Sequence, residues 1–352
     1  MPFNPYSDGW RAGNKEEKLR HFIPVLCVSA AMLMAGMAAT TASAQTILKA
    51  SHQFPGGKGD IRDEMVQIIA REVAAADVGL EIQVFPGSSL YKPNEQWNAV
   101  TRGILDMTSF PLDYAAGRHP EFSATLMPGL VGNLDRAERL NDSEFMTDIR
   151  KIVEDAGAIV IADAWLSGAF ASKKNCITGP ETVAGQVIRA AGPAFEEMLI
   201  AAGASIPSMP SSEVYTGMQT GVLDATNTSS ASFVSFRLYE QVKCLTAPGE
   251  NALWFMYQPI LVSKSVFDRL SEEQRQAILA AAKKAEAFFE AEIRKGDAEM
   301  VEVFKKAGVE VVEMSREDYD KWLSIARESA YKNFAENVPN GQALIDKALA
   351  VE

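Results

Sequence analysis

Residues 179–230 constrain the fold of this chain more than any other stretch, because helix and strand patterns alternate there at short intervals. The apolar run 187–189 ends on a cation, and 195–202 has helical spacing and stops at a glycine. A second helix, capped by its first serine, is expected over 212–221, and a second buried strand over 222–226. Alternation of this length favours an α/β layer with a parallel sheet.

A short motif in this stretch has an echo upstream. Residues 101–108 read TRGILDMT and residues 219–226 read QTGVLDAT. In both, a helical segment ends at a glycine and the next strand carries one aspartate, Asp106 or Asp224. The repeat predicts two similar α/β lobes, and it favours a structural role for the aspartates over paired catalytic carboxylates. Ligands of open α/β sheets bind beyond the carboxyl ends of strands, here at Ser109-Phe110 and Asn227-Thr228.

The amino-acid sequences around both motifs resemble those of a known family. The run AGQVIR … GASIPSMPSSEVYTGMQTGVLDA is similar to the core of the solute-binding proteins of tripartite ATP-independent periplasmic (TRAP) transporters, the DctP-like family. EIQVFPGSSL … AVTRGILDM resembles the matching motif of their first lobe, and the resemblance covers about residues 46–330. It implies an α/β, two-lobed periplasmic binding protein fold, with strands crossing between the lobes and a long C-terminal helix spanning both. It also implies a receptor that delivers its solute to membrane permease subunits.

The positions of the crossing strands set the expected lobe boundaries. The first crossover is placed just after the apolar strand 158–165, and the return crossover near Trp254. A capping box at Ser271 predicts a helix that runs to about Lys306, roughly 50 Å at 1.5 Å per residue and so long enough to lie under both lobes. The predicted segments are 45–166 with about 255–295 for lobe I, and 167–254 with about 296–352 for lobe II.

Residues 1–44 have the pattern of a secretory signal peptide. A basic region precedes the apolar run 22–39, and Ala42-Ser43-Ala44 is a small-residue cleavage site. A single membrane anchor is the alternative for the apolar run, but the cleavage motif favours removal. We therefore expect a mature chain that begins at Gln45 and a soluble protein in the periplasm.

Charge and cysteine content restrict the partners of the mature chain. The formal net charge is −12, and no basic cluster lies beyond the N-terminus, which disfavours nucleic acid and anionic membrane surfaces. Removal of the signal peptide leaves Cys176 and Cys244, and the sequence leaves open whether they pair or remain free thiols. We expect the receptor to act as a monomer.

The sequence offers little for an enzyme to use. The mature chain has two histidines, His52 and His119, and neither has the spacing of a metal ligand. It contains no GxSxG elbow, no phosphate loop and no GxGxxG fingerprint. We therefore expect no catalytic residues, no metal and no cofactor. An exported α/β enzyme is the weaker alternative, and a receptor that feeds a sensor protein is the other.

Arg189 is the leading candidate for ligand binding. It ends an apolar strand, where a charge is costly to bury unless it is paired. Position alone fits an internal ion pair with Glu196 or Glu213 as well as it fits a ligand contact. The resemblance adds that the arginine of the GxxIR strand binds the ligand carboxylate, and Arg189 matches this arginine. A guanidinium fork suits a carboxylate bidentately.

Seven further residues complete the predicted site. Asn227 follows the Asp224 strand, where the family has a polar amide, with an offset of one residue. His52 lies in the loop after the first strand, where family members contact ligand, and a surface histidine is the alternative. The predicted apolar walls, each with core packing as its alternative, are Phe54, Phe110, Trp165 and Tyr215. Phe170 is the last predicted ligand-binding residue.

Two departures from the family bear on the ligand. Sialic-acid-binding members carry a second arginine soon after the first crossover, and the aligned position here is near Phe170. They also have a glutamate where this chain has Pro111. The sequence therefore favours a smaller or more apolar organic acid with one essential carboxylate.

Overall fold

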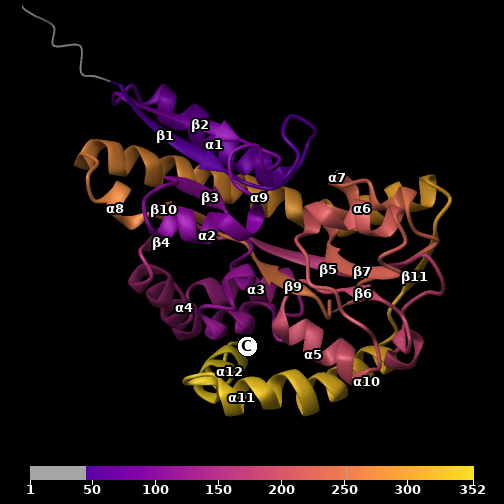
Figure 1. The fold of residues 1–352 in the computed structure, drawn as a ribbon. Helices are drawn as coiled ribbons and strands as arrows, with labels where there is room; N and C mark the ends of the chain where they lie inside the picture. Colours follow the sequence, from indigo (N-terminus) through magenta and orange to yellow (C-terminus); the bar gives the residue numbers. More distant parts are fainter. Residues whose placement is uncertain (1–44, 251) are drawn as a thin grey trace, which may run out of the picture. The chain divides into compact units, whose positions relative to one another are not determined.

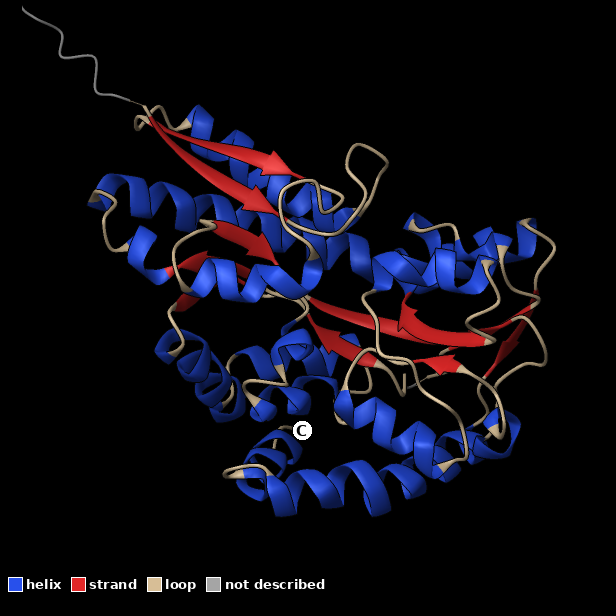
Figure 2. Cartoon of the chain, in the orientation of Figure 1, coloured by secondary structure: helices blue, strands red, loops and turns tan. Residues whose placement is uncertain are grey.

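The computed structural model describes residues 45–250 and 252–352, which form two β-sheets covered by helices (Figures 1 and 2). We define lobe I by its five-stranded sheet, in the order β2 (Leu80–Phe85), β1 (Thr46–Ser51), β3 (Met107–Ser109), β10 (Ile260–Ser263) and β4 (Ala158–Ala162). Lobe II is defined by a sheet in the order β11 (Glu310–Glu313), β8 (Cys244–Ala247), β5 (Trp165–Ser172), β7 (Ala225–Ser229) and β6 (Ile188–Arg189), with β9 (Phe255–Tyr257) also pairing with β5. The predicted signal peptide lies outside the described residues.

Helices cover both sheets. The α-helices are α1 (Ile61–Ala75), α2 (Pro93–Thr101), α3 (Leu134–Asn141), α4 (Glu144–Asp155), α5 (Pro193–Ala201), α6 (Val214–Gln219), α7 (Ser230–Ser235), α8 (Lys264–Phe267), α9 (Glu272–Lys306), α10 (Arg316–Ala326), α11 (Lys332–Asn337) and α12 (Gly341–Leu349). The shorter helical turns are η1 (Leu112–Ala115), η2 (Pro120–Leu126), η3 (Pro180–Val183), η4 (Ser211–Glu213), η5 (Leu238–Glu240) and η6 (Arg327–Tyr331). Among the described residues, no helix combines the length and the apolar composition that crossing a membrane requires.

Strand β5 carries the chain from one lobe to the other. Residues 165–167 pair with β9, whereas residues 168–172 pair with β7 and β8 in the sheet of lobe II. The return path runs through β9 into β10 of lobe I. These crossings confirm the predicted fold class. We propose the lobe boundaries as the sequence predicts them. Helix α12, which falls in the segment predicted for lobe II, packs against α4 and η2, which fall in the segment predicted for lobe I.

Helix α9 is the long C-terminal helix that the sequence predicts. Its capping box has the Ser271 hydroxyl accepting the Gln274 N–H and the Gln274 side chain accepting the Ser271 N–H, each at 3.2 Å. The helix runs through 35 residues, roughly 50 Å at 1.5 Å per residue. It contacts α1 of lobe I and α7 of lobe II (Figure 1). About three quarters of the way along it, Asp297 accepts hydrogen bonds from the hydroxyls of Ser167 and Ser230.

The two echo motifs occupy equivalent places in the two sheets. Asp106 Oδ2 accepts the backbone N–H of Lys49, in β1, at 2.7 Å. Asp224 Oδ2 accepts the backbone N–H of Val187, just before β6, at 3.0 Å. The glycines that precede them have positive φ, 68° at Gly103 and 79° at Gly221. Each aspartate therefore ties its own strand to the parallel neighbour, which is a structural role in both lobes.

Replacement of either aspartate is expected to affect stability and not binding. Asp106→Ala and Asp224→Ala should each lower the free energy of unfolding by about 1–2 kcal/mol, because a backbone N–H between strands loses its acceptor. Urea denaturation measures this loss, and calorimetric titration should show nearly unchanged ligand affinity. A variant with wild-type stability and lost affinity would instead place that aspartate in the binding site.

Two local predictions in residues 179–230 are wrong. Ser212 does not cap a helix, because the turn η4 occupies Ser211–Glu213 and α6 begins only at Val214. The Ser212 N–H points to lobe I instead, 3.4 Å from Gln53 Oε1. Strand β7 begins at Ala225 and not at 222, because the Leu223 N–H bonds to the Gly217 carbonyl and so still belongs to the turn after α6.

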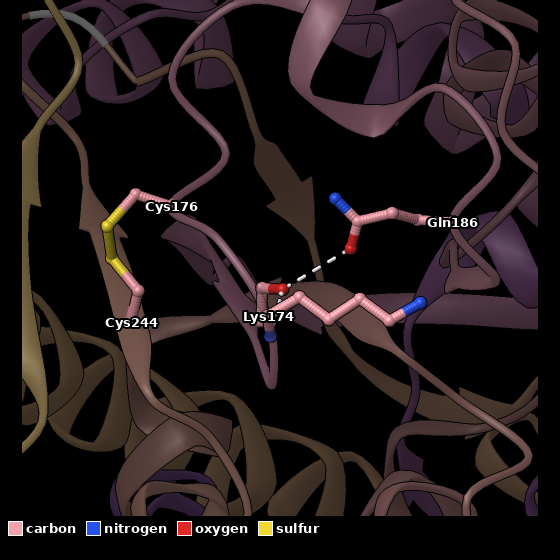
Figure 3. Close-up of a disulfide and its surroundings, with 5 residues drawn as sticks. Lys174, Cys176, Gln186 and Cys244 are labelled. Atoms are coloured by element: carbon pink, nitrogen blue, oxygen red, sulfur yellow. Dashed lines mark hydrogen bonds between the residues drawn. A yellow bond between two sulfur atoms is a disulfide. The ribbon is translucent and has the colours of Figure 1, made fainter.

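A disulfide joins Cys176 to Cys244 and settles the alternative that the sequence leaves open (Figure 3). The two Cα atoms lie 5.2 Å apart, and the bridge ties the segment after β5 to β8. Beside it, the Ser172 hydroxyl accepts the Lys174 N–H at 3.0 Å and donates to Gln186 Oε1 at 3.3 Å. The disulfide and the two hydrogen bonds of the Ser172 hydroxyl together hold the end of β5 in the sheet of lobe II.

Candidate functional site

Arg189 is buried at the end of β6, with 1% of its surface exposed. Its guanidinium donates three hydrogen bonds: Nε to the Met209 carbonyl at 2.9 Å, Nη1 to the Asn227 carbonyl at 2.9 Å and Nη2 to the Tyr114 hydroxyl at 3.0 Å. All three acceptors are neutral oxygens. The guanidinium is thus fixed in place by groups that leave its charge unneutralised.

No carboxylate within residues 45–250 and 252–352 forms an ion pair with Arg189, so the alternative pairing with Glu196 or Glu213 is not formed. A guanidinium has five N–H groups, and one on each nitrogen is already used. One N–H therefore remains on Nη1 and one on Nη2, the number that an end-on fork to a carboxylate requires. A buried cation without a counter-ion is costly, and an anionic ligand would offset that cost.

Tyr114 is a site residue that the sequence reasoning did not single out. It lies on η1, directly after β3 of lobe I, and its hydroxyl accepts hydrogen bonds from Arg189 and from the Ser211 N–H at 2.9 Å, both in lobe II. The sequence feature that could have identified Tyr114 is its position in the turn after residues 101–108, where the ligand is expected. The contact joins the two lobes at the arginine.

Asp113, the neighbour of Tyr114, meets lobe II at Gly192. A Cβ on Gly192 would lie 1.3 Å from Asp113 Oδ2, so the approach of the two lobes depends on a glycine here. Asp113 is buried, and neither of its carboxylate oxygens has a hydrogen-bond partner among the described residues. Burial, reinforced by the nearby Glu196 carboxylate, raises the Asp113 pKa well above its usual value, and Arg189 opposes this rise.

A cavity of about 200 Å³ lies between these parts of the two lobes. The residues that form it include Asn94, Asp113, Tyr114, Gly192, Glu196 and Met209. Tyr114 and Met209 are also hydrogen-bond partners of Arg189, so the cavity lies next to residues that hold the arginine, although Arg189 itself does not form part of its wall. Its size is below the range of pockets for drug-sized ligands and fits a small molecule.

Asn227 lies on β7 with none of its surface exposed, and neither its amide nitrogen nor its amide oxygen has a partner among the described residues. Arg189 is in register with Thr226, and Asn227 is in register with Phe170. Successive residues of a strand point to opposite faces, so Asn227 lies on the Phe170 face and Thr228 on the Arg189 face. The register thus adds Thr228 to the candidates, one residue further along.

His52 and Phe54 are packed inside the loop after β1. His52 is fully buried, which excludes the surface alternative; its Nδ1 accepts the Phe54 N–H at 3.3 Å and its Nε2 lies 3.2 Å from Asp63 Oδ1. The Phe54 ring lies 3.8 Å below the Arg62 guanidinium. These contacts hold the loop at the carboxyl end of the strand, where the ligand is expected.

Trp165 and Phe170 are buried and pack against other residues of the protein. The Trp165 ring lies 4.8 Å from the Tyr257 ring, and its indole N–H donates to Asn141 Oδ1 at 2.8 Å. The Phe170 ring stacks on Trp322 at 5.7 Å. Both side chains therefore have packing partners of their own.

Tyr215 and Phe110 differ in their relation to the site. The Tyr215 hydroxyl donates to Glu240 at 2.9 Å, and this residue is not among those that form the cavity. The Phe110 ring meets the Tyr114 ring edge-on at 6.2 Å. The Phe110 ring therefore packs on a direct hydrogen-bond partner of Arg189.

Two lobes with crossing strands, a helix that contacts both and a buried arginine at their junction define a solute-binding protein. Residues 69–337 match the family described as bacterial extracellular solute-binding protein, family 7 (DctP), and the chain belongs to this family. This confirms the resemblance found in the sequence. The family comprises periplasmic solute-binding proteins and not enzymes.

Individual relatives agree with this assignment. A solute-binding protein of Albidiferax ferrireducens is 39% identical over 311 residues, covering 86% of this chain and 92% of the relative. A TRAP periplasmic solute-binding protein from Rhodoferax ferrireducens, solved with bound malonate, has a TM-score of 0.83 at 38% identity, covering 86% of this chain and 96% of that one. A TRAP protein from Sulfurospirillum deleyianum, solved with bound succinate, shares the fold, with a TM-score of 0.79 at 23% identity, covering 88% and 100%.

Proposed function

We propose that this chain is the periplasmic receptor of a TRAP-type transporter, and that it binds a small organic acid between its lobes and delivers it to membrane permease subunits. The observation that carries the proposal is Arg189, buried, held by three neutral acceptors and left with one N–H on each terminal nitrogen. The carboxylate of the acid would occupy this fork.

The other predicted residues take their proposed places around this contact. Asn227 keeps its predicted place as the second polar contact through its unpartnered amide, with Thr228, which lies on the Arg189 face, as the alternative. Phe110 would form an apolar wall beside Tyr114. His52 and Phe54 would hold the loop after β1 against the ligand. We propose that three residues shape the site from behind through their own packing partners: Trp165, Phe170 and Tyr215.

The proposed ligand is small. The malonate and succinate of the two structural relatives are short acids, and the cavity beside Arg189 measures about 200 Å³. Phe170, aligned with the second arginine of sialic-acid receptors, stacks on Trp322 and offers no charge to a large acidic sugar. These observations support an acid with one essential carboxylate over sialic acid.

A thermal-shift screen tests the proposal. The panel is malonate, succinate, pyroglutamate and D-glucuronate, with sialic acid as the acid expected not to bind. A ligand that binds the native state raises the melting temperature, by an amount that grows with its concentration over Kd. The matched control is Arg189→Ala with the same panel. The proposal fails if no panel acid shifts the wild-type protein, or if Arg189→Ala shows the same shift.

A further inference from the structure

The Tyr114 hydroxyl has one hydrogen that the described structure leaves without an acceptor. A phenol oxygen has two lone pairs and one O–H. Arg189 Nη2 donates to this oxygen at 3.0 Å and the Ser211 N–H donates to it at 2.9 Å, which fills both lone pairs. Within residues 45–250 and 252–352 no acceptor receives the hydroxyl hydrogen of Tyr114.

The position of this hydrogen is set by its two donors. The phenol oxygen accepts both of its hydrogen bonds from lobe II, from Arg189 Nη2 and from the Ser211 N–H. Its own hydrogen is therefore directed away from these two donors. The free N–H groups of Arg189 are on Nη1 and on the same Nη2 that contacts the phenol. The two hydrogens of Nη2 point in different directions, so the phenol oxygen and a ligand oxygen on the free Nη2–H occupy separate positions. Tyr114 also forms part of the wall of the cavity of about 200 Å³, so a carboxylate in this cavity can accept the phenol hydrogen.

We propose that Tyr114 donates a direct hydrogen bond to the ligand carboxylate, so that lobe I completes a fork that lobe II begins. The proposal rests on the proposed function and adds a ligand-binding residue to it. An O–H that accepts a bond from a cation is polarised and becomes a stronger donor. The same hydroxyl therefore orients the arginine and binds the acid.

The packing of Tyr114 makes the test selective. Its ring is held edge-on against Phe110 at 6.2 Å, and the backbone N–H of Tyr114 bonds to the Pro111 carbonyl at 3.0 Å. Tyr114→Phe keeps these contacts and removes the hydroxyl, together with the bonds that it accepts from Arg189 and Ser211. The structure of the complex therefore decides whether the bond to the ligand is direct. The matched control is Tyr331→Phe, which removes a hydroxyl bonded to the Pro128 carbonyl at 2.9 Å, away from the arginine.

The measurement is calorimetric titration with the tightest binder among malonate, succinate, pyroglutamate and D-glucuronate. Tyr114→Phe is expected to raise Kd by about 10- to 100-fold, the range for a hydrogen bond to a charged group. Tyr331→Phe is expected to leave Kd within about twofold of wild type. A crystal structure of the complex should place a carboxylate oxygen about 2.5–2.8 Å from the Tyr114 hydroxyl.

Arg189→Ala, titrated in parallel, separates the two levels of failure. If Arg189→Ala loses binding and Tyr114→Phe keeps wild-type affinity, the Tyr114 inference is overturned and the receptor function stands. If Arg189→Ala itself binds as wild type does, the carboxylate site at Arg189 is wrong. A complex in which the phenol hydrogen points to a protein acceptor, with the carboxylate out of its reach, also overturns the inference.

Discussion

Arg189→Ala is expected to weaken binding of the acid by roughly 30- to several-thousand-fold. Truncating one partner of a buried, hydrogen-bonded charge pair costs about 2–5 kcal/mol, and about 1.4 kcal/mol corresponds to one decade in Kd. The structure supports the upper part of this range. Arg189 is 1% exposed, and within the described part of the chain no other cationic side chain donates a hydrogen bond to Met209, Asn227 or Tyr114.

The companion variant Arg189→Lys is also expected to bind poorly. An ammonium is a point charge, and it cannot keep bonds to Met209, Asn227 and Tyr114 while offering two parallel N–H groups to a carboxylate. Calorimetric titration measures affinity, and melting of both ligand-free variants measures stability. Near-wild-type affinity in Arg189→Ala, with a much lower melting temperature, would show that the arginine serves only the fold.

The second large effect is expected on stability. Cys176 and Cys244 are 68 residues apart, so their disulfide closes a long loop in the unfolded chain. Replacing both by alanine should lower the free energy of unfolding by about 2–4 kcal/mol, because the unfolded state regains conformational freedom. Urea denaturation of oxidised protein, with and without the substitutions, measures the difference.

Reduction provides the control for the disulfide. A reductant should destabilise the wild-type protein and leave the double alanine variant unchanged. Denatured, non-reduced wild-type protein should contain no titratable thiols when its signal peptide has been removed, because both remaining cysteines are in the bridge. Two titratable thiols per mature chain, or equal stability of the two proteins, would contradict the prediction.

Elements with complete local signals were predicted with their observed bounds. From the sequence we also predict a strand over 80–85, the observed bounds of β2, because this stretch alternates between apolar and polar residues and lies between Gly79 and Pro86. The capping box at Ser271 predicts where helix α9 begins. In contrast, β7 begins where its neighbours β5 and β6 pair with it, and such pairing depends on residues distant in the sequence.

In the site, too, some features have a local sequence signal and others depend on residues that are distant in the sequence. Arg189 was predictable because a charge at the end of an apolar strand is unusual by itself, and because its motif resembles a family. The part played by Tyr114 depends on the approach of a turn of lobe I to Arg189 and Ser211 of lobe II, which no local pattern encodes. The choice between Asn227 and Thr228 depends on strand register, and a shift of one residue exchanges the two faces.

The bonds of Asp297 have a mechanical consequence. This residue of α9 holds Ser167, on the strand that crosses between the lobes, and Ser230, at the start of α7. The helix is therefore pinned to the crossover about three quarters of the way along its length, and sliding along its axis would break both bonds. Rotation about the pin would keep them, with the cleft at Arg189 as the part that opens. We expect Asp297 to lie at the pivot about which the two lobes rotate relative to each other.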